Sequence, residues 1–519
     1  MDDRPLMAVW GMAAAYAALF SWLSVLRYRG FSTGRFDLGN MVQAVWSTSQ
    51  GRLLETTDIS GRQFSRLGAH VDPVLVLFAP LWWVWSSPEM LLVAQAVIVA
   101  TGALPAFWLG RRWLGDDRLA LAGAAAYLLY PALQNATLFD FHPVTLAAPL
   151  LLFCIWAAEE ARWVTLGVCA GLAALTQEQV GLVIAALAVW LWFRHPEHRR
   201  AAVILAAGAV AWVATAVVVI MPAFALQSSN AHIQRYSRLG DGPREIALTF
   251  LTRPWEAVAV IATPGRLLYL LAMLLPLLLL PLAAPGLALV GLPQLLINLF
   301  AATGPAQTVD YHYAVLLVPV LVASSLLGLA HLRAQRRPDA LGRFVAEPRW
   351  VAAALVGAVV LSGVFQGPLP LWGWVPGGWG GAPRNAFTID AQAKAMDEAI
   401  ALIPPDAVVA ATNNAGSHLS ARRRILLLPR LGNSDWALLA DGPRLQAMAL
   451  DRPTLHPIGD PFAPNGYIGL RARARLLRTS KKWLLVYERN GVKLYRRVAS
   501  IPGAATPEAQ VESEPRALS

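Results

Sequence analysis

The stretch LMAVWGMAAAYAALFSWLSVL (Leu6–Leu26), followed directly by Arg27, Tyr28 and Arg29, decides the class of this protein. A membrane helix needs about 20 apolar residues, whereas the apolar core of a signal peptide has only about 7–15. No small-residue cleavage site follows the run. We therefore expect a first membrane helix that is retained.

The composition extends this conclusion to the whole chain of 519 residues, which is 56% hydrophobic and only 14% charged. Soluble proteins carry roughly a quarter charged residues, so we predict a polytopic α-helical protein of the plasma membrane. The net charge of +11 is typical of positive-inside loops and of contact with anionic lipids. Nucleic acid is not an expected partner, because no basic, aromatic-interleaved soluble face is present. Cys154 and Cys169 lie in apolar runs and predict neither a disulfide nor a metal site.

Apolar runs predict about eleven spans. They cover roughly residues 6–26, 89–110, 118–132, 143–158, 163–177, 180–193, 201–221, 266–281, 285–301, 312–331 and 350–366. The densest basic clusters then fall on one side of the membrane: Arg111, Arg112 and Arg118; Arg194, His195, His198, Arg199 and Arg200; Arg333, Arg336, Arg337, Arg343 and Arg349. With that side inside, the C-terminal region is extracytoplasmic.

The predicted division is a membrane domain over residues 1–366, with long outer loops at 27–88 and 222–265. Residues 72–85, which include Trp82, Trp83 and Trp85, are apolar but short, and favour an interfacial or re-entrant helix. Residues 367–384 form a Pro/Gly/Trp-rich linker. Residues 385–499 predict a small α/β domain that ends in a hairpin with Asn490-Gly491 at its turn, and residues 500–519 a disordered tail.

Ionisable residues gather on the predicted outer side, in FDLGNMVQAVW, LGAHVDP, LFDFHP, TQEQ and TVDYHY. These motifs contain Asp37, His70, Asp72, Asp140, His142, Glu178, Asp310 and His312. Charge at a bilayer face is costly and usually lines a site or a pathway. On periodicity alone a helix cap is the favoured role for Asp37, and it is also favoured for Asp72, which precedes Pro73.

Other polar residues are candidates for binding. Gln43 lies on the polar face of the amphipathic helix after Phe36. Outer arginines, among them Arg66 and Arg235, suit phosphate, with anionic headgroups as the equal alternative. A divalent metal on His70, Asp72, Asp140 and His142 has suitable ligand types but no compact spacing. The sequence contains no GxxxxGK[ST], HExxH, GxSxG or CxxC, which leaves nucleotide-driven pumping, zinc proteolysis and serine hydrolysis unsupported.

The motifs FDLGNMVQAVW, LGAHVDPVLVLFAPLW, YPALQNATLFDFHPVTLAAPLLL and TQEQ resemble domain of unknown function 2079, as does ATNNAGSHLSARRRILLLP in the C-terminal region. By its layout this family is similar to the GT-C glycosyltransferases, such as protein mannosyltransferases and the aminoarabinose transferase of lipid A. The resemblance implies transfer of a sugar from a polyprenyl-phosphate carrier to a glycan, lipid or protein acceptor at the outer face. It places the catalytic carboxylate at Asp37 and a second acidic residue at Asp140. The sequence departs from the mannosyltransferases, which have Asp-Glu where this chain has Asp37-Leu38.

Two other classes remain open. A transporter for lipid or a small solute predicts inverted repeats and charges near the membrane midplane, and no convincing repeat is visible. A non-catalytic envelope scaffold predicts that Asp37, Asp140 and His142 lie scattered. The enzyme hypothesis predicts that they meet in one site.

Overall fold

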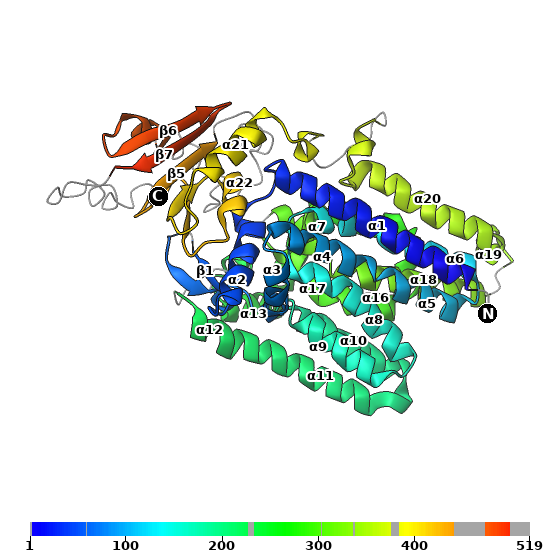
Figure 1. Cartoon of the computed structure of the whole chain (residues 1–519). Coiled ribbons are helices and arrows are strands. Elements are labelled where there is room, and N and C mark those ends of the chain that lie inside the picture. Colours follow the sequence, from blue (N-terminus) through cyan, green and yellow to red (C-terminus); the bar gives the residue numbers. More distant parts are fainter. Residues whose placement is uncertain are drawn as a thin grey trace.

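The computed structural model describes residues 3–58, 60–226, 233–302, 304–335, 338–374, 384–440 and 473–498. It consists of a bundle of helices up to residue 366 and a smaller domain built on a sheet (Figure 1). The N-terminus lies at one end of the bundle and the sheet lies beyond the other end.

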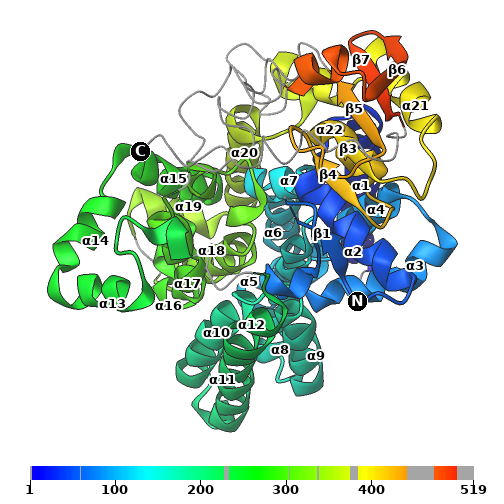
Figure 2. The same ribbon diagram turned by 90° about the vertical axis from the view of Figure 1, so that its left-hand side faces the viewer.

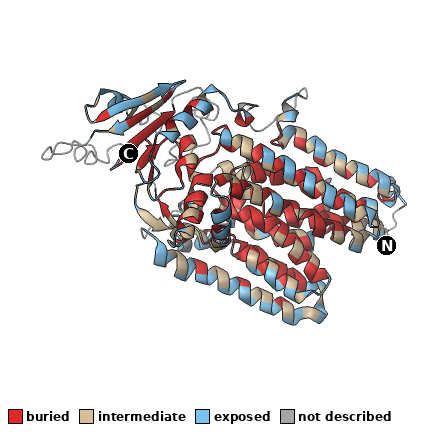
Figure 3. Ribbon diagram, in the orientation of Figure 1, coloured by how far each residue is buried: buried red, intermediate tan, exposed pale blue. Residues whose placement is uncertain are grey.

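The bundle is made of long helices interrupted at prolines and glycines. Its main helices are α1 (Arg4–Arg29), α4 (Pro88–Ala100), α5 (Ala103–Leu114), α6 (Asp117–Leu129), α7 (Pro131–Leu138), α8 (Ala147–Glu159), α9 (Trp163–Ala174), α10 (Val180–Arg194), α11 (Arg199–Ala214), α15 (Pro264–Leu274), α16 (Pro285–Ala288), α17 (Leu292–Phe300), α18 (Leu317–Ala334), α19 (Ala340–Ala346) and α20 (Pro348–Gln366). Figure 3 shows buried residues through the middle of the bundle and exposed ones along α1, α11 and α20. Those exposed residues include apolar side chains such as Ile204, which is 72% exposed, as expected of a surface that faces lipid.

Each predicted span is largely helical, but few helices are long enough to cross a membrane alone. Among the described residues, five helices are long and apolar enough to cross a membrane: Arg4–Arg29, Pro88–Leu114, Pro196–Phe224, Leu317–Ala334 and Pro348–Gln366. A sixth forms if Pro254–Ile261 and Pro264–Leu277, bent by 65°, make one broken span. Five shorter apolar helices accompany them. The count of about eleven therefore stays a prediction.

The expected inner side has one ionic network that joins three helices. The Glu159 side chain is only 2% exposed and pairs with Arg112 of α5 and with Arg194 of α10 at 3.3 and 3.1 Å. His195 lies 3.1 Å from the same carboxylate. Two of the basic clusters therefore meet at one end of the bundle, as their grouping on one side of the membrane requires.

The first outer segment is folded rather than loop-like. It contains the π-helical turn η1 (Arg35–Gly39), α2 (Asn40–Ser49), an antiparallel pair β1 (Glu55–Thr57) and β2 (Gln63–Ser65), the 3-10 turn η2 (Arg66–Gly68), and the short helices η3 (Pro73–Phe78) and α3 (Ala79–Val84). Trp83 is 68% exposed, but Trp82 is buried at 4%. Trp82 packs into a buried apolar cluster that includes residues of α2, whereas Trp85 is 41% exposed.

The second outer segment, expected as a loop over 222–265, is largely helical where it is described. After α12 (Met221–Phe224) and η7 (Ile233–Tyr236) come α13 (Pro243–Thr252) and α14 (Pro254–Ile261). Exposed apolar residues such as Leu251 and Trp255 give these two helices a surface suited to the membrane interface.

In the part of the C-terminal domain that the structure describes, residues 384–440 and 473–498, five strands form a sheet of order β4-β3-β5-β7-β6. Its elements are α21 (Ala391–Ala401), β3 (Val409–Ala411), α22 (Asn413–Gly416), η15 (Ser417–Leu419), β4 (Ile425–Leu427), β5 (Trp436–Ala440), β6 (Trp483–Arg489) and β7 (Val492–Arg497). Strand β3 pairs in parallel with β4 and β5, while β7 is antiparallel to β5 and β6. The predicted hairpin turns at Asn490 and Gly491, both with positive φ. The predicted tail at 500–519 and half of the predicted linker, residues 375–383, lie outside the described residues.

Figure 2 shows α22 and β4 beside α2 and β1. The sheet domain thus rests on the outer segment that follows α1.

Candidate active site

Asp37 lies in the π-helical turn η1 and contacts a histidine from a distant part of the chain. Its Oδ1 is 3.1 Å from Nε2 of His142, and its side chain is 33% exposed, whereas that of His142 is 7% exposed. Neither η1 nor α2 is capped by a side chain. The capping alternative for Asp37 is therefore excluded, and the carboxylate is held at the edge of the bundle by an imidazole.

The second ring nitrogen of His142 faces a backbone acceptor. Nδ1 is 3.0 Å from the carbonyl oxygen of Phe139, which can only accept a hydrogen bond. Both ring nitrogens therefore have a polar partner, Nδ1 the Phe139 carbonyl and Nε2 the Asp37 carboxylate. These two contacts fix the plane of the ring.

Asp140 lies behind this pair and holds the turn that carries Asp37. Its Oδ2 accepts hydrogen bonds from the backbone N–H of Gly34 at 2.8 Å and of Leu38 at 3.4 Å. Asp140 is 2% exposed, and burial, with the nearby Asp37 charge, raises its pKa to about 6. Asp140, the second acidic residue implied by the resemblance, therefore binds the backbone of the turn that carries Asp37.

Gln95, which the sequence analysis did not select, organises the same corner. Its side-chain amide donates to the carbonyls of Thr137 and Asp140 at 3.0 and 2.8 Å, and its oxygen accepts from the N–H of His142 at 3.0 Å. Asp140 adopts φ 53°, a left-handed conformation that Asp tolerates better than most residues. A lone glutamine inside the apolar run LLVAQAVIV was the available signal.

His312 completes the cluster from the turn before α18. Its ring stacks on that of His142 with centroids 3.7 Å apart and planes 19° from parallel. Burial holds the pKa of His312 well below its ordinary value, and neighbouring cationic groups lower it further: His142, His70, Arg235 and Arg66. The imidazole rings of His312 and His142 thus lie face to face at the centre of the cluster.

A second ionic pair lies beside this cluster and joins two predicted motifs. Nδ1 of His70 is 3.1 Å from Oε1 of Glu178, whose Oε2 accepts from the N–H of Val71 at 2.9 Å. Burial alone would raise the pKa of Glu178, but His70 and these hydrogen bonds outweigh it and lower the pKa to about 2. Glu178 is therefore an anion that anchors the first outer segment to the α9–α10 turn.

Three polar residues chosen from the sequence have internal partners. Asp72 does not cap the following helix, which corrects the expectation for it; its Oδ2 accepts from Nε of Arg66 at 2.7 Å, and both residues are buried. Arg66 is therefore held in an internal ion pair. Gln43 is also buried, and its amide donates to the carbonyls of Arg422 and Arg423 at 3.0 and 3.1 Å. Gln43 thus joins the two domains.

Most outer arginines have internal partners. Arg29, Arg52, Arg62 and Arg253 form ion pairs, and Arg27, Arg35 and Arg266 donate to backbone carbonyls. Arg235 is exposed, and its charge reaches His312. Of the predicted arginines, Arg235 is therefore the best placed to meet a ligand at the cluster.

The described residues contain no group of three or more His, Cys, Asp or Glu that could hold a metal ion. The predicted ligands separate into two pairs, with Asp140 bound to backbone and Asp72 to Arg66. This arrangement does not fit the candidate site of four ligands.

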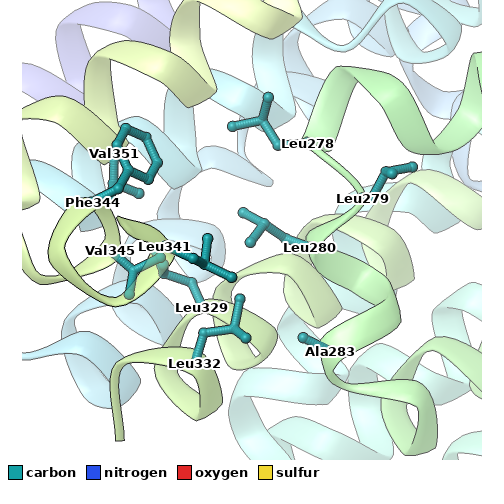
Figure 4. Close-up of a pocket in the computed structure, with 10 residues that line it drawn as sticks. All are labelled: Leu278, Leu279, Leu280, Ala283, Leu329, Leu332, Leu341, Phe344, Val345 and Val351. Atoms are coloured by element: carbon teal, nitrogen blue, oxygen red, sulfur yellow. The ribbon is translucent and has the colours of Figure 1, made fainter. Parts of the chain in front are cut away.

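Two pockets differ sharply in chemistry. One, of about 220 Å³, has a wholly apolar lining of Leu, Ala, Phe and Val side chains (Figure 4). The other, of about 250 Å³, is lined by Gly265, Leu268, Tyr269, Ala272, Gln307, Thr308, Val309, Asp310, Phe365 and Gln366. Only the second has a polar end, and Asp310 places that end two residues from His312.

The fold and the cluster define a polytopic membrane protein with an ionisable site beneath a small sheet domain. The crystal structure of ArnT from Cupriavidus metallidurans in the apo state is similar over 95% of this chain and 99% of that chain, with a TM-score of 0.50 and 14% identity. Archaeal oligosaccharyltransferase AglB from Archaeoglobus fulgidus, in complex with an inhibitory peptide and a dolichol-phosphate, matches over 94% and 75%, with a TM-score of 0.43 and 12% identity. No curated protein matches the sequence.

The family described as predicted membrane protein (DUF2079) matches residues 27–494, and the chain belongs to that family. The similarity to ArnT shows a shared fold.

Proposed function

We propose that the protein is a membrane glycosyltransferase that moves a sugar from a polyprenyl-phosphate carrier to an acceptor hydroxyl at the extracytoplasmic face. The observation that carries the proposal is the contact between Asp37 and His142, 3.1 Å apart and partly open to solvent, on a fold shared with ArnT. A non-catalytic scaffold does not require Asp37 and His142 to lie in contact.

Asp37 is the general base in this proposal. Its Oδ2 accepts the proton of the acceptor hydroxyl while the hydroxyl oxygen attacks the anomeric carbon. The bond from that carbon to the phosphate oxygen breaks, and the phosphate leaves with the bonding electrons. A phosphate leaves without a strong general acid, so a single base, worth about 10²–10⁴-fold, is sufficient.

The remaining residues orient the reacting groups. His142 binds Oδ1 of Asp37 and fixes the direction of the carboxylate. Arg235, exposed beside the cluster, binds the donor phosphate as negative charge develops on it. The pocket that reaches from Leu268 and Phe365 to Asp310 offers apolar walls for the carrier chain next to these polar groups.

The test uses membranes that contain the protein and a panel of polyprenyl-phosphate sugars, with released polyprenyl phosphate as the readout. Asp37→Asn should reduce release by at least about 100-fold at unchanged protein level. Asp58→Asn is the matched control, because Asp58 lies in the same outer segment and its side chain, in the described residues, hydrogen-bonds within the local turn, to Ser60 and Arg62. Normal turnover by Asp37→Asn would remove the assignment of the base.

A further inference from the structure

The turn that carries Asp37 is held from its outer side by the C-terminal domain. The contacts come from residues 411–420, here called the clamp segment, which runs from the end of β3 through α22 and η15. It meets residues 28–39, which connect α1 to α2, almost 400 positions away in the sequence.

Asn413 makes the contact nearest to Asp37. Its Oδ1 accepts a hydrogen bond from the N–H of Phe36 at 3.2 Å. A Cβ built on Gly34 would lie 2.8 Å from its Nδ2, so the amide fills the space beside the turn. Gly34 has φ −111° and ψ 148°, an extended conformation open to any residue, and Asn413 is therefore the obstacle to a side chain there.

A second set of contacts fixes the chain before the turn. The ring of His418 lies between those of Tyr28 and Phe31, with centroids 3.9 and 3.8 Å away. Nε2 of His418 donates to the carbonyl of Tyr28 at 2.8 Å. The hydroxyls of Ser417 and Thr33 are 2.9 Å apart. These contacts leave little freedom between the end of α1 and Asp37.

Close packing completes the clamp. A Cβ on Gly416 would come within 2.6 Å of Cβ of Arg35, and one on Gly39 within 2.6 Å of Oγ of Ser420. The clamp segment follows the carboxyl end of β3, between two parallel neighbours. Open α/β sheets commonly bind ligands at that edge. In this protein the edge is occupied by the Asp37 turn.

We propose that the C-terminal domain is a positioning element of the active site, with Asn413 holding the Asp37 turn against Asp140. The inference rests on the proposed function, because it is the base in that reaction that Asn413 positions. Phe36 N–H is bound by Asn413 on the outer side, and the N–H groups of Gly34 and Leu38 are bound by Asp140 on the inner side. The turn is thus fixed from both domains.

The kinetic test compares Asn413→Ala with Asn414→Ala. The neighbouring amide contacts Met396 within its own domain, at 4.0 Å from the sulfur, so its loss removes the same chemical group without touching the turn. Asn413→Ala should lower kcat about 10- to 100-fold, as expected from misplacement of a reacting group, with KM for the donor unchanged. Asn414→Ala should transfer normally. Equal kcat values for the two variants, in folded protein, would overturn the proposal.

A second variant tests the contact from the other side. Gly34→Ala keeps the N–H that binds Asp140 but displaces the Asn413 amide, so it should lower kcat by a similar factor. The double variant Gly34→Ala/Asn413→Ala should be no slower than either single variant, because the obstacle and the hydrogen bond are both gone. Fully additive losses would show that the two residues act separately and would contradict the clamp.

Hydrogen exchange of the backbone amides of residues 34–39 tests the clamp without any turnover. Exchange should be faster in Asn413→Ala and Gly34→Ala than in Asn414→Ala and the parent protein. Asp37→Asn should leave it unchanged. If no donor supports transfer, or if Asp37→Asn remains active, the proposed function fails while faster exchange still supports the clamp. Equal exchange in all variants would refute the clamp itself.

Discussion

At the scale of single residues, Asp37 differs from every other carboxylate of the cluster in combining exposure with a fixed direction. Asp140, Asp72 and Glu178 are committed to backbone or to cationic partners. One carboxylate oxygen of Asp37 contacts His142, and 33% of the Asp37 side chain is exposed to solvent. A general base needs access to the proton it takes and a defined position from which to take it. Asp37 meets both conditions.

Asp140 should give the reaction an acidic limb. Its pKa is raised to about 6, so transfer should fall as the pH drops through about 6, when protonation removes the negative charge that binds two N–H groups of the Asp37 turn. Asp140→Asn should be slow near neutral pH and should lack this limb. The measurement is kcat against pH for both proteins. If Asp140→Asn shows the same loss of activity at acidic pH, a group other than Asp140 causes that loss.

The raised pKa of Asp140 affects the stability of the fold in the opposite direction to its effect on activity. A carboxyl whose pKa is higher in the folded state binds its proton more tightly there than in the unfolded chain. Between about pH 4 and 6, therefore, the contribution of Asp140 to the free energy of unfolding decreases as the pH rises, and it is constant above that window. Thermal unfolding of the parent protein and of Asp140→Asn, measured in detergent across this pH range, shows whether stability falls or rises with pH.

Replacement of Arg235 should change the KM for the donor more than the KM for the acceptor. Loss of a hydrogen bond to a charged group costs about 1.5–3 kcal/mol, so Arg235→Ala should raise KM for the polyprenyl-phosphate donor by about tenfold or more. Arg244→Ala is the control, since it removes an exposed arginine of the same outer segment. Steady-state kinetics with the donor varied decides the point. Equal effects of the two variants would indicate a general attraction to anionic lipid.

At the scale of elements, the site is built where helices are broken. The chain leaves α1 at Gly30, forms the π-helical turn η1 and only then enters α2. Opposite η1, the chain between α7 and the 3-10 helix η4 (Pro143–Leu146) holds Phe139, Asp140 and His142 in an irregular turn. π-turns and left-handed residues at helix ends are frequent at functional sites. Regular helices on both sides give these turns a rigid support.

The close approach of helix α18 to the η9 segment (Leu280–Ala283) gives an element-level prediction. A Cβ on Gly328 would lie 2.2 Å from the carbonyl oxygen of Leu280, a backbone atom that cannot easily yield. Gly328→Ala should therefore destabilise the protein by about 1–3 kcal/mol. Gly357→Ala, in the interior of α20 with nothing within 4 Å, should be neutral or slightly stabilising. Thermal unfolding of the two variants in detergent tests the contrast. Equal losses would contradict the packing.

At the scale of the whole molecule, ionic chemistry is divided between the two ends of the bundle. One end carries the basic network around Glu159, and the other carries the Asp37 cluster under the C-terminal domain. The positive-inside rule predicts that the first end faces the cytoplasm. The proposed transfer requires the second end to face outward, where it meets the lipid-borne donor and the acceptor.

Cysteine labelling tests this orientation. With Cys154 and Cys169 replaced by alanine, Lys394→Cys places an exposed thiol on α21, and Arg118→Cys places one at the start of α6. In intact cells a membrane-impermeant maleimide should label Lys394→Cys at once and Arg118→Cys only after permeabilisation. The reverse result would invert the orientation and remove the extracytoplasmic site.

The sequence by itself determined the local features, because local features depend on neighbours along the chain. Apolar runs of span length indicated the helices, and Asn490-Gly491 predicted its hairpin. Asp37 and Asp140 were selected because charge at a membrane surface is costly, and resemblance named the family that the comparison confirmed.

The tertiary structure alone decided which polar groups meet, because partners distant in sequence leave no local periodicity. Asp72 fits a helix cap by its neighbour Pro73, yet it binds Arg66. Gln43 fits a substrate-facing helix, yet it binds backbone carbonyls 379 and 380 positions away. Nothing in the sequence pointed to Asn413, whose side chain accepts a hydrogen bond from the N–H of Phe36 only in the folded chain. A buried polar group must find a partner, and only the packed chain shows which partners are within reach.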